Sequence, residues 1–225
     1  GNAVAWSPDG TRLAIGRFGG KGLAIWEPAS GTLVSEFAAN SEPLAQVDNV
    51  RWLDDNLAFS TLSQQLVQWD LTSGIITPVW AKETGTRFDV SWDTNSNRYV
   101  IRTESNKNID FEFAYYVGDI GTGELGPATV IKDVEWRQAQ RGTLTIAPGG
   151  LYFLSGGVLF ETRTLEAVAR YVPQLDRPLG AELVWTAWSP TGTRFAAYGG
   201  GRDNLFVICQ APSDAPPGPC YFQDE

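Results

Sequence analysis

The sequence predicts an all-β protein, and three observations support this prediction. The first is an internal repeat, in which Trp6-Ser7-Pro8 returns as Trp188-Ser189-Pro190 near the other end of the chain. The second is a series of short β-rich runs separated by turn sequences such as Ala147-Pro148-Gly149-Gly150. The third is that no segment shows the apolar period of an amphipathic helix of useful length.

The repeat has the length of one four-stranded propeller blade. Its register positions are separated by 46, 40, 54 and 42 residues, and they are Trp6, Trp52, Trp92, Ile146 and Trp188. Repeats of about 40–45 residues are typical of propeller blades. We therefore expect a single β-propeller domain over 1–225, with about five antiparallel blades at approximately 1–45, 46–85, 86–138, 139–180 and 181–225.

Each expected blade contains recognisable strand sequences. Short apolar runs predict the second strands, and they are Leu13–Ile15, Leu57–Phe59, Tyr99–Ile101, Leu151–Phe153 and Phe195–Ala197. Leu23–Glu27 and Leu66–Asp70 are similar to each other and predict third strands. Apolar residues alternate over a longer stretch in the third blade, at Ile109, Phe111, Phe113, Tyr115 and Val117.

The repeated tryptophans predict the packing between blades. One blade cannot bury both of its faces alone, so blades must pack face to face. We expect the tryptophans to fill these interfaces, each contributing about 1.5–3 kcal/mol by burial. They are Trp6, Trp26, Trp52, Trp69, Trp92 and Trp188.

These residues resemble those of the WD-repeat β-propeller family. The resemblance lies in Trp69-Asp70 with the following Thr72-Ser73-Gly74, and in the two Trp-Ser-Pro units, which also occur in bacterial Trp-Ser-Pro-Asp-Gly propellers. It covers essentially the whole chain and implies a ring of blades whose loops bind other proteins. The chain has no histidine, so the Asp-His-Ser/Thr-Trp tetrad of that family is absent. A closed five-bladed ring and a part of a larger propeller both remain open interpretations.

Composition restricts the functional classes. The net charge is −9, with 17 basic residues spread along the chain, so we expect no nucleic-acid partner. No apolar stretch approaches the ~20 residues of a membrane-spanning helix. The lack of histidine excludes Ser-His-Asp and Cys-His catalysis, and two cysteines cannot form a four-thiolate zinc site. We predict no cofactor.

The two cysteines are a candidate disulfide. Cys209 and Cys220 flank a segment rich in Pro and Gly that would be a loop between two strands. A bond there would contribute about 2–3 kcal/mol, and two free buried thiols are the alternative. A disulfide would favour an oxidising location, in the cell envelope or secreted, over the cytoplasm.

The predicted function is a non-catalytic scaffold that presents loops to another protein or a multi-protein complex. Loops carry recognition because the blades hold them in place, and arginine and aromatic side chains are frequent interface anchors. On this basis the candidate partner-binding residues are Arg17, Phe18, Arg87, Asn108, Trp185 and Arg202.

Two alternatives remain open. One is a propeller that binds a small ligand, a glycan or a metal ion such as Ca²⁺ through carboxylates and carbonyls. The other is a glycoside-cleaving enzyme, which needs two carboxyl groups about 5–9.5 Å apart. The available carboxylates are Asp54, Asp55, Asp89, Asp93, Asp110 and Glu112.

Overall fold

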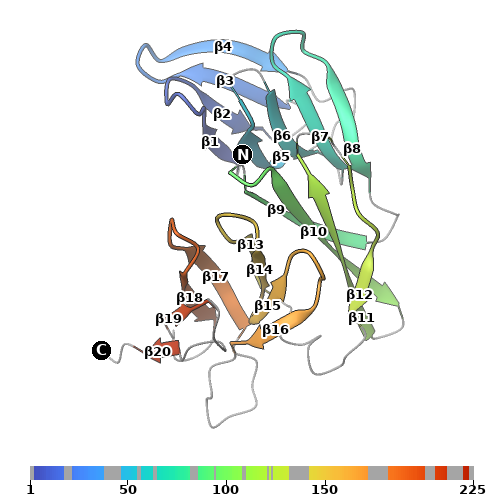
Figure 1. Ribbon diagram of the computed structural model, residues 1–225. Helices are drawn as coiled ribbons and strands as arrows, with labels where there is room; N and C mark the ends of the chain where they lie inside the picture. Colours follow the sequence, from blue (N-terminus) through green and yellow to red (C-terminus); the bar gives the residue numbers. More distant parts are fainter. Residues whose placement is uncertain are drawn as a thin grey trace. The chain divides into compact units, whose positions relative to one another are not determined.

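A computed structural model describes most of the chain. The described residues are 3–17, 22–37, 47–54, 57–62, 65–81, 86–93, 95–107, 110–120, 122, 124–131, 142–171, 182–200, 206–211 and 220–222. In these residues every regular element is a β-strand (Figure 1). By its internal contacts the chain divides into two compact units, unit 1 (Gly1–Thr84) and unit 2 (Gly85–Glu225).

Unit 1 contains two four-stranded antiparallel sheets. Blade 1 is formed by β1 (Val4–Trp6), β2 (Leu13–Gly16), β3 (Leu23–Glu27) and β4 (Thr32–Phe37). Blade 2 is formed by β5 (Val47–Trp52), β6 (Leu57–Leu62), β7 (Gln65–Asp70) and β8 (Ile76–Ala81). In both sheets the spatial order of the strands is the order of the sequence.

Unit 2 contains three further sheets of the same kind. Blade 3 has β9 (Thr86–Asp93), β10 (Arg98–Lys107), β11 (Asp110–Asp119) and β12 (Thr129–Ile131). Blade 4 has β13 (Leu144–Ile146), β14 (Tyr152–Ser155), β15 (Val158–Glu161) and β16 (Ala167–Arg170). Blade 5 has β17 (Glu182–Trp188), β18 (Arg194–Gly200), β19 (Phe206–Gln210) and β20 (Cys220–Phe222).

Five four-stranded antiparallel meanders confirm the predicted β-propeller fold class. Each predicted blade range contains one of these sheets. The predicted second strands all lie on the second strand of a sheet, although Leu151 precedes the first residue of β14.

The turn between the first and second strands repeats as the sequence does. In blade 1 the N–H of Ser7 donates to the carbonyl of Arg12, and the N–H of Gly10 donates to the carbonyl of Ser7, both at 2.9 Å. The same pair of bonds recurs in the 189–194 turn of blade 5, and in the 147–152 turn of blade 4. The closing glycines Gly10, Gly150 and Gly192 have φ values of 71°, 67° and 68°, a region that favours glycine.

The core of unit 1 lies between blades 1 and 2. It contains small and aliphatic residues of blade 1 packed on tryptophans of blade 2, and its buried members are Ala3, Ala14, Leu23, Ile25, Val47, Val50, Trp52, Val67 and Trp69. The indole Nε1 of Trp52 donates to the carbonyl of Ala5 at 2.9 Å, and the Arg12 guanidinium lies 5.0 Å from the centre of the Trp52 ring. Trp52 therefore joins its blade to the preceding one.

Unit 2 has two core clusters, one at each of its blade interfaces. The first joins blades 3 and 4 through aromatic rings, among which Phe153 and Phe160 stack at 4.9 Å and Tyr115 packs on both. The second joins blades 4 and 5 through Leu154, Leu159, Ala169, Tyr171, Phe195, Ala197 and Cys209. Trp188 borders this second cluster, and its Nε1 donates to the Thr145 hydroxyl at 3.2 Å.

The expected role of the repeated tryptophans holds for some positions and is wrong for one. Trp52 and Trp69 are buried, and Trp26, Trp92 and Trp188 are half-buried. Trp6 is 58% exposed, so it does not fill an interface in this structure. The physical reason within unit 1 is that blade 2 packs on the other face of blade 1, the face that carries Ala5, so the core of this unit does not include Trp6.

Candidate interaction surface

The structure describes three of the six predicted partner-binding residues. Arg17 directly follows β2 in the connection to β3, Arg87 lies on β9, and Trp185 lies on β17. The predictions for Phe18, Asn108 and Arg202 fall outside the described residues. The three described positions lie on blades 1, 3 and 5.

Arg17 is the predicted residue whose side chain is described. Its backbone N–H donates to the carbonyl of Gly22 at 2.9 Å, which closes the connection between β2 and β3. Its guanidinium forms an ion pair with Glu36 near the end of β4, and the two side chains are 29% and 49% exposed. This pair lies at one end of blade 1.

Arg87 and Trp185 are placed by strand register. Arg87 lies opposite Glu104 in the β9–β10 pair. Trp185 lies opposite Tyr198, directly after an irregularity in the β17–β18 pairing between Leu183 and Trp185. Both residues are therefore on first strands, and not in the loops before them.

A buried arginine forms the most extensive polar cluster of the described residues. Arg102 on β10 is 7% exposed, and it donates to Ser155 Oγ at 2.8 Å and to the carbonyl of Gly142 at 2.8 Å. It also forms an ion pair with Asp89 on β9. Because Ser155 and Gly142 belong to blade 4, this cluster joins blades 3 and 4.

Tyr115 completes this cluster. Its hydroxyl donates to Ser155 Oγ at 2.8 Å, and burial raises the pKa of the phenol. The sequence reasoning missed Arg102, although a signal was present. With a period of two, Arg102 lies on the same face of β10 as Val100, a face that packs on blade 4. A charge on a buried strand face requires partners, which here are Asp89 and Ser155.

Two carboxylates of the enzyme alternative, Asp93 and Asp89, bind groups within the blades. Asp93 is 8% exposed, and its Oδ2 accepts the N–H of Ser96 at 3.2 Å and the N–H of Gly149 at 2.9 Å. It thus closes its own turn and holds the turn of blade 4. Asp89 is paired with Arg102, and Asp54 is exposed in the turn after β5.

Hydrogen bonds within the turns favour the ionised form of two aspartates. A hydrogen bond from the Ser7 hydroxyl, with further bonds from Thr11, lowers the pKa of Asp9 to about 2. The backbone N–H of Ser73, aided by Thr72, lowers the pKa of Asp70. These bonds explain the Ser-Pro-Asp-Gly and Asp-x-Thr-Ser-Gly patterns as turn chemistry.

Cys209 is disulfide-bonded in the structure. It lies on β19, and its register partner on β20 is Cys220, the other cysteine of the sequence. The two cysteines are therefore opposite residues of neighbouring strands at the edge of blade 5.

Two kinds of feature are absent from the described residues. Among them, no group of three or more His, Cys, Asp or Glu side chains is arranged to hold a metal ion. The same residues include no helix that is long and apolar enough to span a bilayer.

The fold defines the class of protein as a β-propeller, and solved structures share it. The chain is similar to a chain of Kuenenia stuttgartiensis hydrazine synthase, with a TM-score of 0.68, 14% identity, and coverage of 92% of this chain and 64% of that one. It is also similar to a chain of a mitotic checkpoint complex, with a TM-score of 0.66, 15% identity, and coverage of 99% and 66%.

The chain thus spans just under two thirds of the length of these two solved chains. At such identities the likeness shows the fold alone. No family model matches the sequence, and no curated protein matches it.

Proposed function

We propose that the chain is a non-catalytic interaction scaffold that binds another protein or a multi-protein complex. The observation that carries this proposal is its fold, which it shares over 99% of its length with a chain of a mitotic checkpoint complex. Packed blades hold their connections at fixed positions, and such connections are where binding residues concentrate. The acidic balance of the chain, with a net charge of −9, favours a partner with basic character.

The Arg17–Glu36 pair is the best-defined contact point for such a partner. An exposed ion pair contributes only about 0–1 kcal/mol to folding, so its loss leaves the blade intact. A partner that contacts Arg17 would lose a charged hydrogen bond when this residue is truncated. Arg87, Trp185, Phe18, Asn108 and Arg202 are further candidates for the same test.

The structural roles of the carboxylates support the non-catalytic interpretation. Asp93 binds backbone N–H groups, and Asp89 binds the buried Arg102. Both carboxylates therefore have bonding partners within the blades, whereas glycoside cleavage uses two carboxyl groups that flank an open site.

The first test is the molar mass of the protein isolated gently from its natural source, with any co-purifying chains identified. We expect a stoichiometric companion protein. A chain that is isolated without a companion protein contradicts the proposal and directs attention to ligand and glycan screens.

The second test identifies the surface. Arg17→Ala should weaken binding of the identified companion by about 10-fold or more, as for an arginine at an interface anchor. Arg163→Ala is the matched control, since Arg163 is an exposed arginine in the turn between β15 and β16. Equal affinities for the two variants would exclude the Arg17 end of blade 1 from the binding surface.

A further inference from the structure

The turn between β1 and β2 contains an aspartate that is followed by a glycine. Asp9-Gly10 is the only Asp-Gly pair of the sequence, and the sequence contains no Asn-Gly pair. In an Asp-Gly pair the glycine nitrogen can attack the side-chain carboxyl of the aspartate, because glycine has no Cβ to obstruct the approach. The product is an isoaspartate, in which the main chain continues through the side-chain carboxyl.

The reaction has two steps. In the first, the Gly10 nitrogen forms a bond to Asp9 Cγ, and one carboxyl oxygen leaves as water with the carboxyl proton and the amide proton. In the second, water opens the resulting five-membered imide at one of its two carbonyls, which gives aspartate or isoaspartate. The leaving oxygen must be protonated, and the nitrogen must be free to approach Cγ. Hydrogen bonds that favour the ionised carboxylate or hold the amide therefore slow the first step.

Three hydrogen bonds hold the Asp9 carboxylate. The Ser7 hydroxyl donates to Oδ1 at 2.6 Å, the N–H of Thr11 donates to Oδ1 at 3.0 Å, and the Thr11 hydroxyl donates to Oδ2 at 2.8 Å. Donors to a carboxylate stabilise its ionised form, and these bonds lower the pKa of Asp9 to about 2. Both carboxyl oxygens are therefore poor leaving groups at neutral pH.

The attacking nitrogen is held as well. The N–H of Gly10 donates to the carbonyl of Ser7 at 2.9 Å. Ser7 is 3% exposed, and its Oγ also accepts the N–H of Arg12 at 2.8 Å. Ser7 therefore fixes the side chain of Asp9 and the main chain of Gly10 at the same time.

The equivalent turn of blade 5 shows that this turn does not need a carboxylate. Thr191 occupies the position of Asp9, and its hydroxyl lies 2.8 Å from the hydroxyl of Thr193. The two backbone bonds of the turn recur there at 2.8 Å and 2.9 Å. Blade 1 thus contains a reactive pair that its turn geometry does not require, with two hydroxyls bonded to it.

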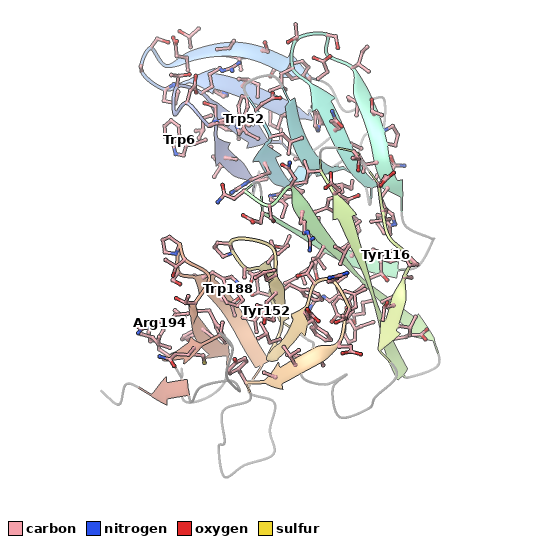
Figure 2. The ribbon with its side chains drawn as sticks, in the orientation of Figure 1. Trp6, Trp52, Tyr116, Tyr152, Trp188 and Arg194 are labelled. Atoms are coloured by element: carbon pink, nitrogen blue, oxygen red, sulfur yellow. The ribbon has the colours of Figure 1, made fainter. Side chains whose placement is uncertain are left out.

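An isoaspartate at this position would alter the joint between blades 1 and 2. It lengthens the main chain of the turn by one methylene group. Arg12 ends the turn, and its guanidinium lies 5.0 Å from the centre of the Trp52 ring of blade 2. Trp6, which directly precedes the turn, and Trp52 are labelled in Figure 2. A lengthened turn would change the position of Arg12 relative to this ring.

We propose that Asp9-Gly10 is a site of isoaspartate formation that the hydroxyls of Ser7 and Thr11 suppress in the folded chain. The suppression preserves the turn that carries Arg12. It concerns one turn of blade 1 and does not depend on the proposed protein partner.

The experiment incubates the full chain at mildly acidic pH and follows Asp9 by peptide mapping. Electron-transfer fragmentation of the peptide distinguishes aspartate from isoaspartate. The same chain unfolded in guanidinium chloride is the reference, and it should convert at least about 10-fold faster than the folded chain, since one pKa unit changes the protonated fraction tenfold. Asp9→Thr, which introduces the residue of blade 5, should give no isoaspartate at this position in either state.

Three variants identify the suppressing groups. Thr11→Val removes one hydroxyl donor and keeps the backbone N–H, so Asp9 should convert about 2–10-fold faster, the range for the loss of one hydrogen bond. Thr11→Ser restores the hydroxyl and should convert as slowly as the unaltered chain. Ser7→Ala should convert faster than the unaltered chain, because it removes a hydroxyl that is bonded to both Asp9 and the main chain. Thr193→Val is the matched control in blade 5 and should leave the conversion of Asp9 unchanged.

Far-UV circular dichroism and thermal unfolding verify that each variant is folded during the incubation. The proposal is supported if the folded chain converts slowly and Thr11→Val converts faster than Thr11→Ser. It is overturned if the folded and unfolded chains convert at equal rates, or if folded Thr11→Val converts as slowly as the unaltered chain. If Ser7→Ala does not fold, the comparison of the two Thr11 variants decides. None of these results affects the search for a companion protein, so the two proposals fail separately.

Discussion

The two compact units join their blades by different chemistry. In unit 1, an indole packs on small and aliphatic residues and donates one hydrogen bond, from Trp52 to Ala5. In unit 2, the contact of blades 3 and 4 combines stacked rings with the polar cluster of Arg102 and Ser155. All seven tyrosines of the chain lie in unit 2. The same blade architecture is therefore compatible with two kinds of blade interface. One is mainly apolar, between blades 1 and 2, and is called the apolar joint below. The other contains a buried charge, between blades 3 and 4, and is called the charged joint.

The difference matters because substitutions in the two joints should lower the free energy of unfolding for different reasons. An apolar joint loses stability in proportion to the area and cavity that a truncation creates. A joint with a buried charge loses stability mainly when one partner is removed and the other is left without compensation. Substitutions at each joint can therefore separate the two kinds of contact.

The largest expected effect is at the apolar joint. Trp52→Ala should reduce the free energy of unfolding by about 3–5 kcal/mol, because Trp52 is fully packed between two blades. Trp6→Ala is the matched control and should change it by less than about 0.5 kcal/mol in dilute solution, since Trp6 is exposed. Urea unfolding followed by circular dichroism measures both values. Equal losses would show that the two tryptophans have equivalent surroundings.

The next effect is at the charged joint. Arg102→Met keeps the length of the side chain but removes the donor to Asp89 and to the carbonyl of Gly142, while Ser155 still accepts from Tyr115. We expect a loss of about 2–3 kcal/mol, below the usual cost for a fully buried pair because Asp89 is partly exposed. Arg163→Met, at an exposed arginine, should be neutral under the same urea unfolding. A neutral Arg102→Met would mean that the cluster contributes no stability.

A smaller effect is expected where the turns of blades 3 and 4 meet. A Cβ on Gly150 would collide with the Ser96 hydroxyl, and the backbone there has φ +67°. Gly150→Ala should therefore cost about 1–3 kcal/mol. Gly149→Ala, with φ +87° and no atom within 4 Å of a Cβ, should show only the conformational cost of about 1 kcal/mol.

Thermal unfolding of both glycine variants tests this comparison. A double variant, Gly150→Ala with Ser96→Gly, should recover the part of the loss that is due to the collision. If the double variant recovers nothing, the turns do not touch in solution.

The smallest expected effect is a loss of the folding stability of unit 2 at alkaline pH. Burial raises the pKa of Tyr99 and of Tyr171 to about 12. The folded state thus holds these protons more tightly than the unfolded state, whose tyrosines titrate near pH 10. The contribution is fully present below about pH 10 and is lost as the pH rises from about 10 to about 12.

Urea unfolding at several pH values, with phenolate absorbance at 295 nm as the second readout, measures this loss. Tyr171→Phe should make the decline between pH 10 and 12 shallower. Since unit 1 contains no tyrosine, its tryptophan signal should change only after unit 2 has lost structure. Tyrosines that ionise near pH 10 without loss of stability would contradict the burial.

The sequence predicted the fold and the apolar joint well, because both repeat with the blade. Trp-Ser-Pro with the following turn marks the start of a blade, and the alternation through Phe113, Tyr115 and Val117 marks the long strand of blade 3. The exposure of Trp6 was not predictable from the motif, because the burial of a repeated residue depends on what packs on its face of the blade, which the motif does not encode.

The charged joint and the interaction surface were harder to predict for physical reasons. Arg102 occurs once, so no repeat draws attention to it, and its partners are 13 and 53 residues away in the chain. Arg17 was chosen for its residue type, but its pairing with Glu36 depends on how the strands of blade 1 align. Loop contacts of this kind leave no periodic signal in a sequence.

The central claim is that a first-strand tryptophan joins its blade to the preceding one. Hydrogen exchange of the indole N–H groups, followed by NMR, tests it most directly. The unaltered chain in dilute solution is the appropriate sample, because it contains all of the tryptophans that are compared. We predict slow exchange at Trp52 and Trp188, whose indoles donate to Ala5 and Thr145, and exchange at Trp6 as fast as in a free indole. Fast exchange at Trp52, or exchange at Trp6 as slow as at Trp52, would contradict the claim.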